Sequence, residues 1–214
     1  MEITWFGHSC FRIREKGVVI VTDPYEEAIG LTLPPLRADI VTVSHHHPGH
    51  GNWRKVKGEP KVLDSPGEYE IKGVFITGIR TYHDSRQGKE RGKNVAFLLE
   101  FENISVCHLG DIGHIPDRDQ LEALNHVDIL LVPVGGVSTI GPAQAVEIVR
   151  LLEPSIVIPM HYHVKGLNFR LNSVEKFFKE LGLAPPRPIE TLKVTAQNLP
   201  SETQFYLLER REQP

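Results

Sequence analysis

The sequence feature that most constrains the fold is a short apolar run that ends in a cluster of histidines. Residues 40–43 read Ile-Val-Thr-Val, and after Ser44 histidines occupy positions 45, 46, 47 and 50. A β-branched run of this length predicts a buried strand. On an extended backbone the side chains of His45 and His47 point to the same side, and histidine is the commonest metal ligand. Because Pro48-Gly49 turns the chain and brings His50 back, the sequence predicts a strand that delivers metal ligands to the loop at its end.

The pattern of elements differs between the two halves of the chain. In the first half, apolar and polar residues alternate as they do in β-strands. In the second half, segments with the pattern of strands are followed by segments with the pattern of helices. We expect strands near 3–6, 10–13, 18–21, 39–44, 60–63, 69–71, 74–82, 95–101, 104–108, 128–134, 155–160, 191–194 and 204–208, and helices near 117–124, 142–152 and 172–181. Asn172 and Glu175 have the spacing of a capping box. With no linker in sight, this order predicts a single domain over residues 1–214, built from two sheets covered by helices.

Composition excludes several classes of protein. The chain has 214 residues, of which 40% are hydrophobic, enough for one sizeable core, and its formal net charge of -3 gives no basic face for nucleic acid. Two cysteines are too few for a disulfide framework. The sequence has no targeting segment and no apolar run near the ~20 residues that cross a bilayer. We therefore expect a cytoplasmic protein without a nucleic-acid or membrane partner, whose oligomeric state, a homo-oligomer included, stays open.

Further histidines and aspartates stand at the ends of other predicted strands. These residues are His8, Asp23, His83, His108, Asp111 and His161. Polar residues at strand ends gather at the rim of a sheet, and in this way a site collects ligands from distant parts of a chain. We expect Asp23 to orient a ligand histidine through its ring N–H.

Two sets of ligands follow from these positions. The first set comprises His45, His47 and His108. Three imidazoles leave a fourth position on Zn²⁺ for water, and the ion lowers the pKa of that water from 15.7 to about 7. The second set comprises His50, Asp111 and His161. The Asp111 carboxylate would bridge two ions about 3.5–4 Å apart, which together hold the attacking oxygen and the oxygen under attack.

Three residues are candidates for catalytic roles. Asp111 would orient the attacking water or act as its general base. His8 and His83 would contact the substrate or protonate the leaving group. For His8 the alternatives are support of a ligand or an ordinary turn residue, and for His83 they are similar, with Asp84 as a partner for its ring N–H.

The ordered motifs resemble those of a known family. His45-x-His47-x-x-His50, Leu109-Gly110-Asp111 and Pro159-Met160-His161 look like the ligand motifs of the metallo-β-lactamase superfamily. Gly7-His8-Ser9, Thr22-Asp23-Pro24 and Val134-Gly135-Gly136 resemble its branch of small proteins similar to L-ascorbate-6-phosphate lactonase. The resemblance runs from about residue 3 to 163. It implies an αββα sandwich of two mixed β-sheets flanked by helices, with two ions at one edge, usually zinc or manganese. Known activities of the family include hydrolysis of lactones, thioesters, β-lactams and phosphodiesters.

The chain departs from the family pattern at Gly49. The family has an aspartate there, directly before the last histidine of the motif, and its carboxylate ligates the second ion. The resemblance therefore implies that the second site is weaker or takes a different ion, and that Gly49→Asp raises its occupancy.

We predict a metal-dependent hydrolase with one or two zinc ions, manganese being the other candidate. A metal-bound hydroxide would attack an ester-like bond of a small molecule, such as a lactone, phosphodiester or thioester. Three alternatives follow from Gly49. The centre is mononuclear, or it is dinuclear with water or another side chain in the gap, or the chain is a non-catalytic metal-binding or regulatory protein that keeps the fold.

Overall fold

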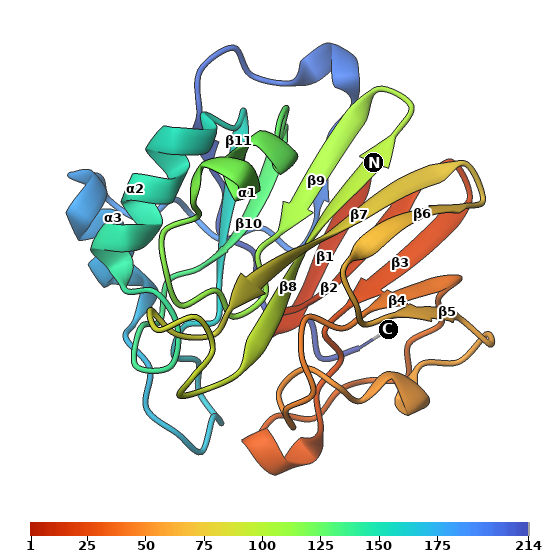
Figure 1. Ribbon diagram of the computed structural model, residues 1–214, viewed down its shortest axis with the longest axis horizontal. Helices are drawn as coiled ribbons and strands as arrows, with labels where there is room; N and C mark the ends of the chain where they lie inside the picture. The colour runs from red at the N-terminus through yellow and green to blue at the C-terminus, as the bar shows by residue number, and fades with distance from the viewer. Residues whose placement is uncertain (214) are drawn as a thin grey trace.

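The computed structural model describes residues 1–213 and shows two β-sheets packed face to face (Figure 1). The first sheet has the order β12-β1-β2-β3-β4-β5, with β1 (Glu2–Gly7), β2 (Cys10–Glu15), β3 (Val18–Thr22), β4 (Ile40–Thr42), β5 (Lys61–Leu63) and β12 (Leu192–Lys193). The second has the order β13-β11-β10-β9-β8-β7-β6, with β6 (Gly67–Ile71), β7 (Val74–Tyr82), β8 (Lys93–Phe101), β9 (Ile104–His108), β10 (Ile129–Pro133), β11 (Ile156–Met160) and β13 (Gln204–Phe205). Both sheets mix parallel and antiparallel pairs, so the predicted sandwich of two mixed sheets is confirmed.

The helices lie against the outer face of the second sheet, at the left of Figure 1. They are α1 (Arg118–Ala123), α2 (Pro142–Leu152) and α3 (Val174–Leu181). Strands β10 and β11 are buried along their whole length because the first sheet covers one face and these helices cover the other. Their sequences accordingly read as continuous apolar runs and do not alternate.

The helix ends agree with the sequence at α1 and differ at α3. At α1 the Asp117 carboxylate accepts a hydrogen bond from Gln120 N, and the Gln120 side chain accepts one from Asp117 N, which closes a capping box. The capping box expected at Asn172 and Glu175 is wrong. Helix α3 begins after Ser173 without a side-chain cap, and Asn172 instead accepts a hydrogen bond from Lys176.

The outer face of the first sheet is covered by irregular chain. Residues 24–38 and 52–57 contribute only the 3₁₀ turns η1 (Glu27–Ile29) and η2 (Trp53–Lys55), since Pro34 and Pro35 oppose a longer helix. A second apolar core lies beneath this segment, around Tyr25, whose hydroxyl donates a hydrogen bond to Phe6 O at 2.6 Å.

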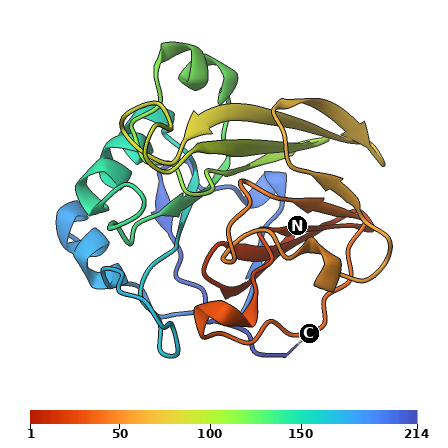
Figure 2. The same ribbon diagram turned by 60° about the horizontal axis from the view of Figure 1, so that its bottom comes forward.

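The strand directions place the functional loops at one edge of the sandwich. Pairing makes β1, β3 and β4 run the same way in the first sheet, and β7, β9 and β11 the same way in the second. The two carboxyl edges meet, because His161 N after β11 donates a hydrogen bond to His8 O after β1 at 3.1 Å. These loops lie toward the bottom of Figure 1 and come forward in Figure 2.

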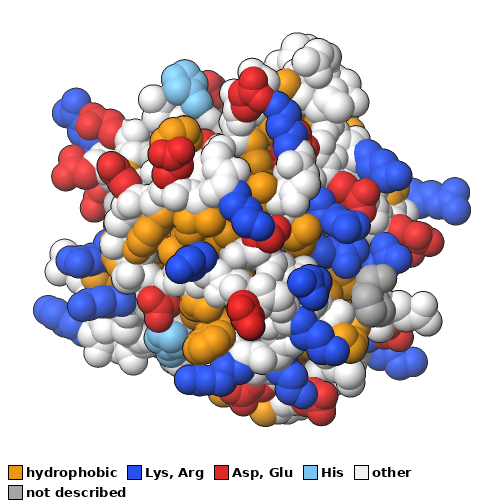
Figure 3. Space-filling view, turned by 90° about the vertical axis from the view of Figure 1, so that its right-hand side faces the viewer, with side chains coloured by type: hydrophobic (Ala, Val, Ile, Leu, Met, Phe, Trp, Pro, Cys, Tyr) orange, Lys and Arg blue, Asp and Glu red, His pale blue; other side chains and the backbone are white. Residues whose placement is uncertain are grey.

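Charged side chains of both signs are interspersed with apolar ones on the face shown in Figure 3. The described chain, residues 1–213, contains no helix with the length and apolarity required to cross a membrane.

A third 3₁₀ turn, η3 (Ala196–Asn198), follows β12.

Candidate metal centre

The loop after β4 brings its histidines to the edge of the sandwich as the motif predicted. His50 N and Gly51 N both donate hydrogen bonds to His47 O, at 2.9 and 3.0 Å, and this turn folds His50 back beneath the strand end. His45 and His50 are buried, whereas His47 is exposed at the surface. His46 is exposed as well, so the loop presents two imidazoles to solvent and two to the interior.

Asp111 lies at the centre of the cluster. It follows β9 across Gly110, which has φ +57° and would bring a Cβ within 2.5 Å of Asn94 Oδ1. Asn94 Oδ1 in turn accepts a hydrogen bond from Asp111 N at 2.9 Å. A close approach that only glycine allows, together with a buried amide, fixes the position of this carboxylate.

One oxygen of Asp111 is surrounded by imidazole nitrogens. The Nε2 atoms of His161, His50, His83 and His45 lie 3.1, 3.2, 3.4 and 3.9 Å from Asp111 Oδ2. Ligands on a tetrahedral zinc ion with bonds of 2.0–2.1 Å are about 3.3 Å apart. The donor atoms are therefore already spaced like the ligands of a metal ion.

The donors form overlapping groups that suit two neighbouring ions. Three groups of residues each place one ligand atom per residue within 4.8 Å of the others. The first group is His45, His47 and His83, the second is His45, His50 and Asp111, and the third is His8, His50 and His161. His45 Nε2 and Asp111 Oδ1 are buried without a hydrogen-bond partner among residues 1–213. Because a buried polar atom without a partner is costly, these atoms fit a site whose donors are completed by a cation.

Burial and charge set the protonation of the cluster. Burial, and then the charge of His50, lowers the pKa of His45 to about 2. Burial also opposes charge on His50, but the carboxylates of Asp111 and Asp23 outweigh this effect and raise the pKa of His50 to about 10. Burial acts to raise the pKa of Asp111, yet the neighbouring His161 and His50 hold it well below its usual range. At neutral pH, Asp111 is thus a carboxylate and His45 a neutral imidazole, the form that binds a metal.

Asp23 supports the cluster from behind, as expected. Its Oδ2 lies 2.8 Å from His50 Nδ1, which directs the Nε2 of that ring towards Asp111. Asp23 also accepts hydrogen bonds from Ser44 N and Ser44 Oγ, at 2.7 and 2.6 Å. The carboxylate therefore couples the end of β4 to His50.

The structure does not bring His108 into the cluster. His108 is the last paired residue of β9, and its ring points into the space between the sheets, near Phe11. Its Nε2 lies 2.9 Å from Ser9 O, and its Nδ1 accepts a hydrogen bond from Gly110 N. Both ring nitrogens thus have other partners, and no donor group among residues 1–213 includes His108. This corrects the ligand set predicted from the sequence.

His83 takes the place that was predicted for His108. It directly follows β7, and its ring lies 4.7 Å from that of His45 between centroids. Asp84 is not its partner, because the Asp84 carboxylate accepts hydrogen bonds from four backbone N–H groups of the next loop, at residues 86, 88, 90 and 91. A signal in the sequence distinguishes the two histidines: His83 comes after the last residue of its strand, whereas His108 is still within one.

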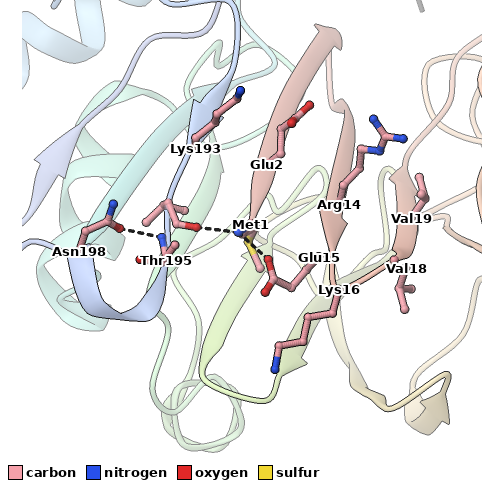
Figure 4. Close-up of a pocket in the computed structure, with 12 residues that line it drawn as sticks. Met1, Glu2, Arg14, Glu15, Lys16, Val18, Val19, Lys193, Thr195 and Asn198 are labelled. Atoms are coloured by element: carbon pink, nitrogen blue, oxygen red, sulfur yellow. Dashed lines mark hydrogen bonds and ion pairs between the residues drawn. The ribbon is translucent and has the colours of Figure 1, made fainter.

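The cluster forms the floor of a cleft of about 600 Å³. Its rim includes Arg91, Ser138 and Phe169, from loops that converge on the carboxyl edge. A second hollow of about 570 Å³ lies at the opposite edge, beside the N-terminus (Figure 4). There the amino group of Met1 is paired with Glu15 and Val194 O, and Thr195 N with the Asn198 side chain, so these groups have partners within the hollow. The buried donors without partners make the histidine cleft the candidate functional site.

Comparison with known proteins identifies the family of this fold. Residues 2–161 match the family described as the beta-lactamase superfamily domain. A UPF0173 protein of Pyrococcus abyssi is 31% identical over 204 residues, which cover 85% of this chain and 90% of that protein. A relative from Methanoculleus marisnigri, named a UPF0173 metal-dependent hydrolase, is 29% identical over 185 residues, covering 76% of this chain and 81% of the relative.

A solved structure extends the similarity to the whole fold. The crystal structure from Thermotoga maritima, described as a candidate Zn-dependent hydrolase of the metallo-β-lactamase superfamily, has a TM-score of 0.82 and 42% identity, and the match covers 97% of both chains. The sandwich, the order of the motifs and these similarities together show that the chain belongs to the metallo-β-lactamase superfamily.

Proposed function

We propose that this protein is a metal-dependent hydrolase that cleaves an ester-like bond of a small molecule, such as a lactone, phosphodiester or thioester. The observation that supports this most strongly is the position of Asp111, whose Oδ2 lies 3.1–3.9 Å from the Nε2 atoms of four histidines on the floor of a cleft. Relatives of the chain are named metal-dependent hydrolases, which supports the same reaction class.

The donor groups divide between two ions. His45, His47 and His83 would hold the first, and His50 and His161 the second, with Asp111 shared between them. The donors are mostly imidazole nitrogens, which suit zinc better than manganese, and zinc is the metal that the Thermotoga neighbour's description names. Bound zinc supplies two things here: it acidifies a water molecule and polarises the oxygen of the bond under attack.

The protein's own groups position the reactants. Asp111 Oδ1 is buried and has no hydrogen-bond partner among the described residues, so it can accept a hydrogen bond from the attacking water or take its proton. The exposed His47 borders the open side of the cleft, where a substrate enters. Arg91 on the rim, 3.5 Å from Ser138 O, places a cation where an anionic group of the substrate would lie.

Metal removal and restoration test the proposal. We expect protein loaded with zinc to hydrolyse at least one member of a panel of lactones, thioesters and bis-p-nitrophenyl phosphate. Treatment with a chelator should abolish that activity, and added zinc should restore it. A protein that binds zinc yet turns over none of the panel would contradict the proposal and favour the non-catalytic role. A protein that binds no transition metal would contradict both.

A further inference from the structure

We propose that His8 is a ligand of the second ion and occupies the place left open by Gly49. The sequence motif predicts a weakened second site there. The structure assigns a nitrogen donor to the position instead. This inference rests on the proposed metal centre and names a ligand that lies outside the three ligand motifs of the sequence.

The space beside Gly49 is filled by the His8 ring. A Cβ added at Gly49 would lie 2.7 Å from His8 Nε2 and 3.1 Å from its Cδ2. Atoms of an ordinary side chain cannot approach so closely, so a residue larger than glycine and this imidazole exclude each other. Gly49 is therefore the feature that admits His8 to the cluster.

The His8 nitrogen points at the other donors of the second site. His8 Nε2 lies 3.2 Å from His50 Nε2, close to the spacing of about 3.3 Å expected between ligands on one zinc ion. His50 Nδ1 is occupied by Asp23, so the nitrogen that faces His8 is the one left for a metal. His8, His50 and His161 are all buried, and their donor atoms lie within 4.8 Å of one another.

The backbone holds His8 in this position. Its φ of +52° is in the left-handed region, which a residue other than glycine keeps only when its surroundings enforce it. His8 O accepts hydrogen bonds from Trp5 Nε1 at 3.0 Å and from His161 N at 3.1 Å. The ring packs against those of His161 and Phe169, with centroids 4.1 and 5.7 Å away. Backbone strain at a buried polar residue is typical of a functional site, and here it directs an imidazole into the donor group.

A nitrogen donor changes the chemistry of the second site. Asp111 is the single carboxylate in the donor groups found within residues 1–213. The pair of ions would therefore carry more net positive charge than with a second carboxylate. Imidazole ligands favour zinc, nickel, copper and iron, whereas carboxylates favour manganese. We expect the second site to prefer a nitrogen-seeking ion.

Calorimetric titration tests this inference without an activity assay. The full-length protein is first stripped of metal with a chelator and then titrated with Zn²⁺ or with Mn²⁺. The wild-type protein should bind two zinc ions per chain. Since loss of a supporting group alone costs about 10–100-fold in affinity, His8→Ala should weaken the second zinc site by at least about 100-fold and leave the first unchanged. Gly49→Ala removes no donor, yet its Cβ would displace the ring and should have a similar effect.

A matched control and an exchange of donors complete the design. Gly51→Ala lies in the same loop, but its Cβ would meet its nearest neighbour at an ordinary 3.5 Å, so both sites should be retained. His8→Ala combined with Gly49→Asp should restore the second ion and increase binding of Mn²⁺. Gly49→Asp alone would exchange one donor for another, so the inference predicts an exchange in place of the simple rise in occupancy expected from the sequence.

Two results with the variants, and two with the wild-type protein, would overturn the inference. One is a second zinc site in His8→Ala as tight as in the wild type, and the other is equal behaviour of Gly49→Ala and Gly51→Ala. A wild-type protein that binds only one ion would also overturn it, while leaving the first site and the proposed hydrolase intact. A wild-type protein that binds none would overturn both.

Discussion

The histidine cluster has two halves that use the same kind of donor but are supported differently. The first half-site (His45, His47, His83) lies partly open, because His47 is exposed. The second half-site (His8, His50, His161) is wholly buried, and the φ angles of both His8 and His161 are +52°. Residues of both half-sites line the cleft, but the first adds an exposed imidazole, whereas the second is held by the backbone and by Asp23. We infer that the first half-site faces the chemistry and that the second is built to retain its ion.

The largest effect is expected where the two half-sites meet. Asp111→Asn keeps the shape of the side chain but removes the charge shared by both ions. If the ions contribute several kcal/mol to the reaction, kcat/KM should fall by about 10³-fold or more. Metal analysis should show that both sites bind more weakly. Glu90→Gln, which neutralises a carboxylate at the rim of the cleft, is the control and should retain both ions.

The two half-sites should respond differently to loss of a ligand. His47→Ala should weaken the first ion by about 100-fold without changing the thermal stability of the metal-free protein, because His47 is exposed. His50→Ala should weaken the second ion and lower the free energy of unfolding by about 1–3 kcal/mol, since the buried Asp23 carboxylate loses its imidazole partner and keeps only the hydrogen bonds from Ser44. If the metal-free His47→Ala and His50→Ala variants were equally stable, the two half-sites would not differ in how they are supported.

A substitution at Asp23, which supports the second half-site, should lower metal affinity at that half-site more than at the first. Asp23→Asn alters the acceptor at His50 Nδ1, and loss of such a support typically costs about 10–100-fold in metal affinity. We expect the second ion to weaken by this amount and the first to change less. Asp64→Asn is the matched control, because Asp64 contacts His46, an exposed histidine outside the donor groups. Calorimetric titration of both variants decides whether the support is specific.

The smallest effect is expected at the rim. Arg91→Gln removes an exposed cation, and such contacts contribute up to about 1 kcal/mol. For an anionic substrate KM should rise by about fivefold while kcat and metal content stay unchanged. A fall in kcat with an unchanged KM would place Arg91 in the reaction itself and contradict its proposed role in binding.

Much of the fold could be predicted because its signals are local. Alternation over residues 74–82 and the helical spacing over 142–152 match β7 and α2 in full. The strand before His45, expected at 39–44 and observed at Ile40–Thr42, and the position of Asp111 after β9 follow from signals of the same kind. These features depend on periodicity and on breaks in it, which the sequence displays directly.

Which histidines join the donor groups was harder to predict. The outcome depends on whether a histidine lies within a strand or just after its end, and on contacts between the two sheets. His108 and His83 both stand at strand ends, but one residue of register decides that the first points into the core and the second into the cleft. The role of Gly49 was equally inaccessible. Its meaning depends on the ring of His8, which is 41 positions earlier in the chain and reaches the cluster through the pairing of β1 within the first sheet and the hydrogen bond from His161 N.

The most direct test of the account is a crystal structure of the zinc-loaded protein with anomalous scattering measured at the zinc edge. We expect two peaks on either side of the Asp111 carboxylate, one among His45, His47 and His83 and the other among His8, His50 and His161, with His8 Nε2 at a bonding distance of about 2.1 Å. A single peak, or a second ion with the His8 ring turned away and water in its place, would contradict the central claim.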